Sequence, residues 1–158
     1  MNRIKTAEGR GGRLIAARLL PGSNFVKGLV EVCERHGVRN GALLSCIDSF
    51  KKTVFLDPIP RPELKAGYGH GDPLSVDGPI ELLSPSGFIC HADDGQVLLH
   101  VHANMCLADG KAFGGHLTDD GTEVLLTADV LIQEVDGIDM VRRYDDEMQI
   151  LTFSPTQL

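Results

Sequence analysis

Turn signals divide the second half of the chain into short apolar segments. The signals are Ser84-Pro85-Ser86-Gly87, Asp93-Asp94-Gly95, Asp109-Gly110 and Asp119-Asp120-Gly121, and they separate PIELLS, GFICHA, QVLLHVHANM, KAFGGHL, EVLLTADVLIQEV and MQILTF. Short apolar runs divided in this way are typical of strands joined by hairpins. The pattern predicts a sheet in which most neighbouring strands are antiparallel.

The first half of the chain adds one helix to this sheet. Arg13–Leu20 (RLIAARLL) reads as a strand that ends at Pro21-Gly22. Ser23 or Asn24 can cap a helix over NFVKGLVEVCERHG, with Gly37 at its end. ALLSCIDSF and KKTVFLD read as two further strands. We therefore expect an α+β fold with a mostly antiparallel sheet and one main N-terminal helix.

Length and composition bound the organisation and the location of the protein. A chain of 158 residues fits one domain, expected over residues 1–158 with a flexible stretch at 1–12. No apolar run approaches the roughly 20 residues that a membrane helix needs. The opening residues lack the apolar core of a signal peptide, which predicts a cytoplasmic location and no membrane partner.

Charge and cysteine spacing argue against two classes of function. A net charge of −7 is a poor match to phosphate backbones, so DNA binding is weakly supported. The four cysteines form no CxxC pair, which removes the usual pattern of a zinc ribbon or a thioredoxin. We interpret them as small buried thiols in a reducing compartment.

Residues 58–79 differ in composition from the rest. This stretch holds many of the prolines and glycines and reads as a long irregular loop. Loops of this length in compact domains usually bind something or pack on a neighbour. His70 reads as an exposed loop histidine, but with Tyr68 it could also cover a site.

Three of the six histidines fall within LLHVHANMCLADGKAFGGHL. His100 and His102 project to the same side of a strand, because side chains at i and i+2 share a face. The position of His116 depends on the hairpin. A two-residue Asp109-Gly110 turn places it opposite Ala103, on the wrong face. A three-residue loop, or a bulge at Gly114-Gly115, restores it to the face of His102.

A cluster of three imidazoles would suit a divalent metal. Three neutral histidines are a common ligand set for zinc and leave one coordination position open, as in catalytic sites. No carboxylate stands within the motif to serve as a general base. Two alternatives therefore remain: a regulatory or interaction protein that binds a metal, and a metal-dependent enzyme that acts on a small molecule. Half-buried sheet histidines without metal are the plain alternative.

Other residues could lie beside this site. If Asp94-Gly95 forms a two-residue turn, Ile89 lies opposite His100 and His91 shares the histidine face. Glu81 lies in an apolar strand, either exposed or paired. Arg142 belongs to a compact charge cluster that reads either as a surface ion-pair network or as an anion site at a subunit junction.

Several segments together resemble the PPC domain, the plants and prokaryotes conserved family. The matching positions are Gly78 with Glu81–Leu83, His100 with His102, Gly114–Leu117, and Thr127–Val130, in which Asp129 replaces the family's Glu. The earlier segment RLIAARLLPGSNFVKGLVEVCERHG is similar to the family's opening strand and helix. The likeness extends over nearly the whole chain.

The resemblance implies a homotrimeric α+β domain that contacts protein partners. It also implies a metal held by His100, His102 and His116, and it suggests DNA binding by analogy with prokaryotic members. RGGR, at Arg10–Arg13, lacks the proline of an AT-hook, so the chain is similar to the prokaryotic type without that element.

Overall fold

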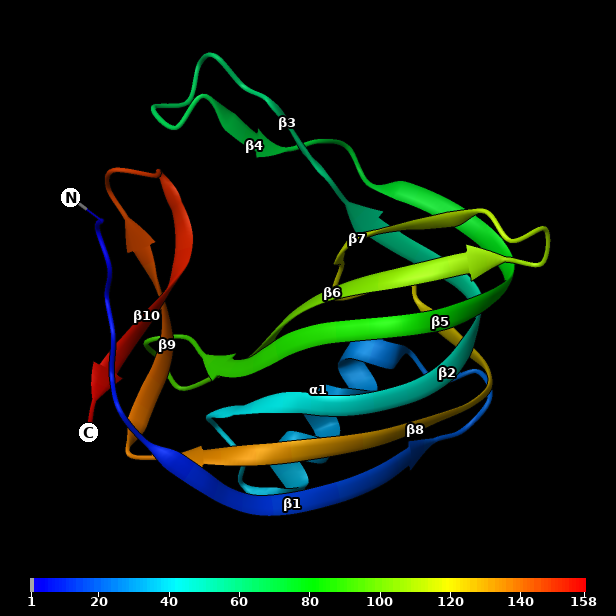
Figure 1. Ribbon diagram of the computed structural model, residues 1–158, viewed down its shortest axis with the longest axis horizontal. Coiled ribbons are helices and arrows are strands. Elements are labelled where there is room, and N and C mark those ends of the chain that lie inside the picture. The colour runs from blue at the N-terminus through cyan, green and yellow to red at the C-terminus, as the bar shows by residue number, and fades with distance from the viewer. Residues whose placement is uncertain (1) are drawn as a thin grey trace.

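The structure, a computed structural model, describes residues 2–158 (Figure 1). One helix and ten strands follow one another in this part of the chain. The elements are β1 (Arg10–Leu19), α1 (Phe25–His36), β2 (Gly41–Leu56), β3 (Pro58–Pro60), β4 (Tyr68–His70), β5 (Leu74–His91), β6 (Val97–Leu107), β7 (Ala112–Leu117), β8 (Glu123–Asp136), β9 (Ile138–Asp145) and β10 (Ile150–Gln157).

Eight of these strands form one strongly curved sheet. Its order is β1-β8-β2-β7-β6-β5-β9-β10, and β2 also pairs with β5. The neighbours are antiparallel except at β5 and β9, which meet in a parallel pairing of His91 with Val141. β3 and β4 form a separate two-stranded hairpin. The predicted α+β fold with a mostly antiparallel sheet and one main helix is confirmed.

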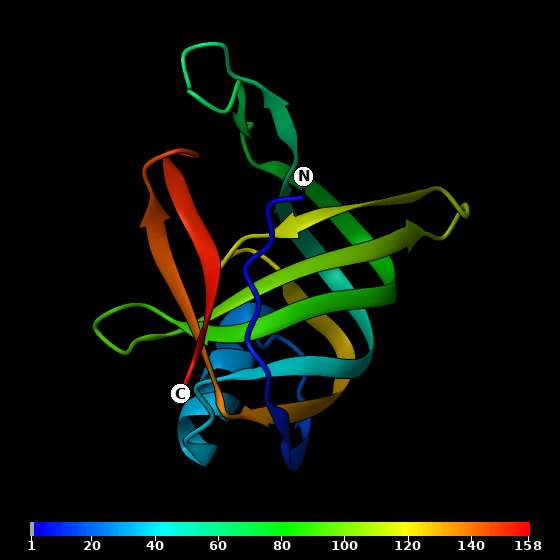
Figure 2. The ribbon, with the colours of Figure 1, turned by 60° about the vertical axis from the view of Figure 1, so that its left-hand side comes forward.

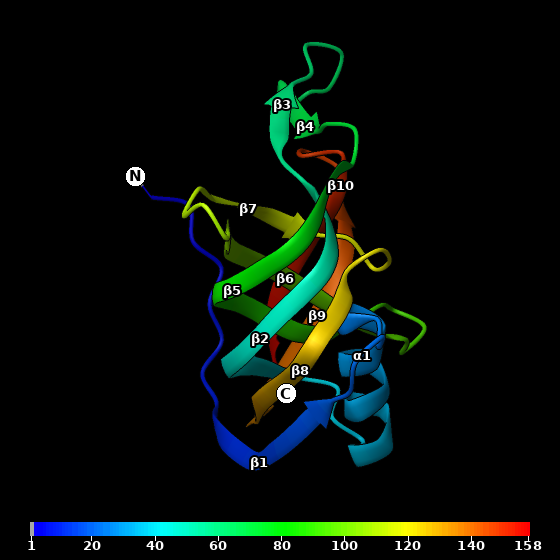
Figure 3. The same ribbon diagram turned by 90° about the vertical axis from the view of Figure 1, so that its right-hand side faces the viewer.

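The helix α1 covers one face of the sheet (Figure 3). Its start is fixed by the Asn24 side chain, which accepts a hydrogen bond from the Lys27 amide at 2.9 Å. Gly37 ends it in a left-handed conformation with φ of 65°. Phe25 and Leu29 are fully buried, and the Phe25 ring packs edge-on against Phe50 of β2 at 5.1 Å. Both expected caps are confirmed.

The opposite face of the sheet can be followed across five strands by direct pairing. Leu14 lies opposite Gln133, Gln133 opposite Ala42, Ala42 opposite Phe88, and Phe88 opposite His100. Paired residues share a face. His100 therefore points away from α1, on a face that we call the outer face.

The stretch expected as one long loop is more ordered than its composition suggests. Residues 58–60 and 68–70 pair as the β3–β4 hairpin, and β5 already begins at Leu74. Leu74 lies opposite Phe55, so the end of this stretch extends the pairing of β5 with β2. β2 itself is one strand of 16 residues where two were expected. Prolines and glycines mark turns, but they do not show which distant strand pairs with the residues between them.

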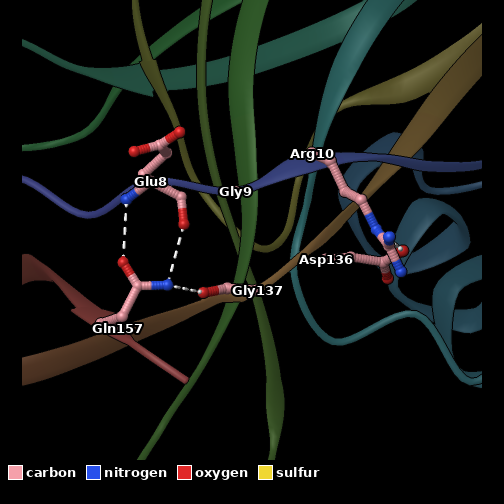
Figure 4. Close-up of a pocket in the computed structure, with 6 residues that line it drawn as sticks. All are labelled: Glu8, Gly9, Arg10, Asp136, Gly137 and Gln157. Atoms are coloured by element: carbon pink, nitrogen blue, oxygen red, sulfur yellow. Dashed lines mark hydrogen bonds and ion pairs between the residues drawn. The ribbon is translucent and has the colours of Figure 1, made fainter.

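The N-terminal residues are tied to the C-terminal strand (Figure 4). The Gln157 side-chain amide donates to the backbone oxygens of Glu8 and Gly137 at 2.9 and 2.7 Å and accepts from the Glu8 amide at 3.1 Å. Arg10 then begins β1. The expectation of a flexible stretch over residues 1–12 therefore fails for Glu8–Gly12, because the Gln157 amide and the β1–β8 pairing hold them.

Two hairpins stand out from the sheet on the same side (Figures 1 and 2). They are β3–β4 and β9–β10. Their tips are joined because the Lys65 amide donates to the Gln149 side-chain oxygen at 2.8 Å. The base of β9 is fixed where Asp139 lies 2.6 Å from the His91 ring. The hairpins thus form an arch beside the sheet.

The burial of the cysteines agrees with a simpler expectation. Cys33, Cys46 and Cys90 are buried and free, and Cys106 is half-buried and free. Burial raises the pKa of the Cys33 and Cys46 thiols to about 12, which makes them unreactive. Within residues 2–158, no helix has the length and apolar character to cross a bilayer.

The carboxyl group of Asp48 is buried without a full set of hydrogen bonds. Asp48 of β2 is 4% exposed, its Oδ1 accepts from the Ser49 amide, and its Oδ2 has no hydrogen-bond partner among the described residues. Burial, together with the nearby charges of Glu81 and Asp129, raises the pKa of Asp48 to about 7. The ionised form therefore destabilises the fold.

The raised pKa of Asp48 predicts that the free energy of unfolding falls as the pH rises. The pKa of Asp48 in the folded state lies above the unfolded value of 3.8. The stability that the protonated carboxyl group contributes is therefore fully present below about pH 4 and is lost as the pH approaches 7. Asp48→Asn should raise the free energy of unfolding at pH 8 by about 1–3 kcal/mol and change it little at pH 4. Urea unfolding at both pH values measures this. An equal effect at both pH values would contradict it.

Candidate metal centre

Three imidazoles meet on the outer face of β6 and β7. His100 and His102 are two residues apart on β6, and His116 of β7 lies directly opposite His102. His102 Nε2 is 3.1 Å from His100 Nε2 and 3.3 Å from His116 Nδ1. The ring centroids are 4.9 to 5.2 Å apart. The three rings are directed at one point.

The loop between β6 and β7 sets this alignment. Leu107 donates to the Lys111 carbonyl at 3.1 Å, which leaves Ala108, Asp109 and Gly110 as a three-residue loop. Gly110 has a φ of 80°, the left-handed conformation that such a loop requires at its last position. Of the alternatives that the sequence leaves open, the three-residue loop is correct and the two-residue turn is wrong.

Gly114 and Gly115 serve close packing, and the β6–β7 register runs through them without a bulge. A Cβ atom on Gly115 would come within 2.5 Å of Asp57 Oδ1 and 2.6 Å of the Phe55 ring. The next residue, His116, pairs with Leu56 of β2 as well as with His102. β7 is thus wedged between two strands, and this position holds His116 in place.

The spacing of the nitrogens fits a tetrahedral metal ion. Two zinc–nitrogen bonds of 2.0–2.1 Å at a tetrahedral angle place their nitrogens about 3.3 Å apart. One ligand atom from each of the three histidines lies within 4.8 Å of the others. Within residues 2–158 no Asp, Glu or Cys joins this group. The three histidines could therefore hold a metal ion with at least one position left for another ligand.

The electrostatic environment keeps two of these rings neutral. Burial, together with the neighbouring His100 and His70 rings, lowers the pKa of His116 to about 4. Burial also lowers the pKa of His100, with the Arg142 charge as the next cause. Neutral imidazole is the form that binds metals, so the donors are ready at neutral pH.

His70 lies beside this group although it is distant in sequence. Its ring centroid is 4.9 Å from that of His116. His70 ends β4, so the β3–β4 hairpin brings it to the site while the side chain stays exposed. The interpretation as a plain exposed loop histidine was incomplete. Tyr68, two residues earlier, is 63% exposed and lies outside the group of nitrogens.

The β9–β10 hairpin brings a cation and an aromatic ring to the His100 side of the histidine group. Phe153 lies opposite Arg142 in this hairpin, so both share a face. The Phe153 ring stacks on Phe88 at 5.2 Å, and Phe88 lies opposite His100. Arg142 is therefore directed toward the imidazoles. The sequence points to Arg142, but nothing in it indicates the contact between Phe88 and Phe153.

Two other expected neighbours lie elsewhere. His91 is only 6% exposed and lies opposite Val97 on the core side, because the β5–β6 hairpin also has a three-residue loop that ends at Gly95. The expectation that His91 shares the histidine face is wrong. Glu81 is exposed and pairs with Cys106, further along β6 than the imidazoles.

Comparison with known proteins agrees with the fold and the motifs. The family model of the Plants and Prokaryotes Conserved (PCC) domain, called PPC above, matches residues 6–136. The chain belongs to the PPC family. The match includes β1, α1 and the whole histidine hairpin. No curated protein matches the sequence.

Solved structures share this PPC fold. A metal-containing protein from Archaeoglobus fulgidus is 23% identical with a TM-score of 0.81, covering 95% of this chain and 99% of that one. A plant- and prokaryote-conserved protein from Pyrococcus horikoshii is also 23% identical, with a TM-score of 0.79 and coverage of 98% and 100%. A proposed DNA-binding protein from Bacteroides thetaiotaomicron is 17% identical, with a TM-score of 0.72 and coverage of 92% and 96%.

Proposed function

We propose that this PPC protein binds one divalent metal ion, zinc, through His100, His102 and His116, and acts as a regulatory or interaction protein. The observation that carries the proposal is the spacing of the three nitrogens, which fits tetrahedral coordination. The similar fold of the metal-containing Archaeoglobus fulgidus protein supports it. Three histidines at tetrahedral spacing with one position open are a common zinc site, which favours zinc among the metals that imidazole binds.

The ligand set also bears on the choice between binding and catalysis. Hydrolytic metal sites usually pair the metal with a nearby carboxylate that accepts a proton. Within residues 2–158 the metal-ligating group contains no carboxylate. A binding role is therefore our first proposal. The open coordination position keeps a metal-dependent enzyme acting on a small molecule as the second.

Self-association, as a homotrimer, forms part of the proposal. On the outer face Leu14 is 61% and Ile47 is 70% exposed. A shallow depression of about 580 Å³ beside Ile47 includes Ala16 and Leu131 together with the Arg18–Asp129 ion pair. Exposed apolar surface of this kind is typical of protein contacts. It supports contact with further copies of the chain.

DNA is a weaker candidate partner. Structural neighbours from two bacteria carry a proposed DNA-binding role. Arg13 and Arg18 on β1, however, already form ion pairs with Glu134 and Asp129 at 2.7 and 2.5 Å. With a net charge of −7, few free cations remain to contact phosphates.

Metal content tests the proposal. Untagged protein purified without chelator should carry about one zinc per chain by elemental analysis, because three imidazoles converge on one point. The His100→Ala/His102→Ala double variant should carry almost none. His36→Ala is the matched control, since His36 is an exposed histidine at the end of α1 and should not affect the metal. Equal metal content in the double variant and the wild type would contradict the proposal.

The oligomeric state tests the proposed self-association as a homotrimer. Sedimentation equilibrium should give the mass of a trimer for the wild type. Ile47→Glu should shift it toward the monomer, because a charge buried in an apolar contact costs several kcal/mol unless it is paired. Ile4→Glu makes the same change at an isoleucine that is 72% exposed on the N-terminal segment, and it should leave the mass unchanged. A monomeric wild type would refute the trimer.

A further inference from the structure

Arg142 is held beside the imidazoles with part of its guanidinium unused. Its Nη2 donates to the Leu151 carbonyl of β10 at 3.1 Å. Its Nε is buried and has no hydrogen-bond partner among the described residues. A buried donor without an acceptor is costly, and in native structures such a group usually has a partner such as a ligand, an ion or water. The Arg142 Nε–H therefore calls for an acceptor.

The charges around this donor indicate the charge that its missing acceptor carries. The Arg142 charge acts on the His100 and His116 imidazoles. Within residues 2–158 no carboxylate belongs to the metal-ligating group. A divalent ion together with the Arg142 cation would carry three positive units, and the Asp57 carboxylate beside Gly115 would balance only one of them. In a half-buried setting such a charge strongly favours an anion.

The β9–β10 and β3–β4 hairpins each bring a residue to the histidine group. β9–β10 supplies Arg142, with Phe153 packed on Phe88 as an apolar wall. β3–β4 supplies His70 on the side of His116. The hydrogen bond between Lys65 and Gln149 joins the tips of the two hairpins. The two hairpins thus flank the histidine group, with Arg142 and His70 each contributed by one of them.

We propose that the open coordination position takes a small carboxylate, with one oxygen on the metal and the other on the Arg142 Nε–H. The inference rests on the metal centre proposed above and gives its ligand a chemical class. A carboxylate has two oxygens for the two available contacts. A phosphate would leave further oxygens without donors, since Arg142 Nη2 is already used and Arg143 pairs with Asp93 at 2.7 Å.

Cobalt-substituted protein tests the ligand directly. The full chain is loaded with Co²⁺, whose visible absorption reports its coordination, and titrated with sodium acetate at constant ionic strength. Acetate should change the spectrum with saturation. Arg142→Gln should weaken this binding roughly tenfold or more, because it removes a charge-assisted hydrogen bond. Arg142→Lys, which keeps the charge but not the Nε–H geometry, should fall between the two.

Arg143→Gln is the matched control, because its guanidinium pairs with Asp93 instead. It should bind acetate like the wild type. Equal acetate affinity in the wild type, Arg142→Gln and Arg142→Lys, or a cobalt spectrum that acetate does not change, would overturn the inference and leave the metal centre standing. Tighter binding of inorganic phosphate through Arg142 would overturn the carboxylate class. A wild-type chain that takes up no cobalt would overturn both proposals.

Discussion

The pairing of His102 with His116 is the constraint on which the candidate site depends. One residue more or less in the β6–β7 loop would turn His116 to the other face, because side chains alternate along a strand. Three elements hold the register: Gly110 in its left-handed conformation, the close approach that Gly115 permits, and the pairing of His116 with Leu56 of β2. The site is thus built on paired strands, which favours a preorganised ligand geometry.

Around these imidazoles the fold places positive charge and little that could balance it. The two hairpins supply His70 and Arg142. Of the nearby carboxylates, Asp139 contacts His91 and Asp93 pairs with Arg143, which leaves Asp57 beside Gly115. This separation suits a centre that takes its anion from outside. The same outer face carries exposed apolar residues such as Ile47, so metal binding and self-association would share one surface of the sheet.

The sequence was sufficient for features set by local chemistry. The caps of α1 at Asn24 and Gly37, the strand alternation that aligns His100 with His102, and the β5–β6 and β6–β7 hairpins were predictable. The turn expected at Ser84–Gly87 was wrong, because these residues lie inside the single strand β5. The sequence was insufficient where distant contacts decide. An Asp-Gly pair fits a two-residue or a three-residue loop, which left His116 open and put His91 on the wrong face. The position of His70 depends on how the β3–β4 hairpin packs, and its proline-rich composition does not reveal that.

The most direct test of the central claim is X-ray absorption at the zinc edge of the metal-loaded protein. Our account predicts three imidazole nitrogens at about 2.0–2.1 Å together with one oxygen ligand. A shell of sulfur at about 2.3 Å, or oxygen ligands without imidazole, would show that the metal binds elsewhere and would contradict the three-histidine centre.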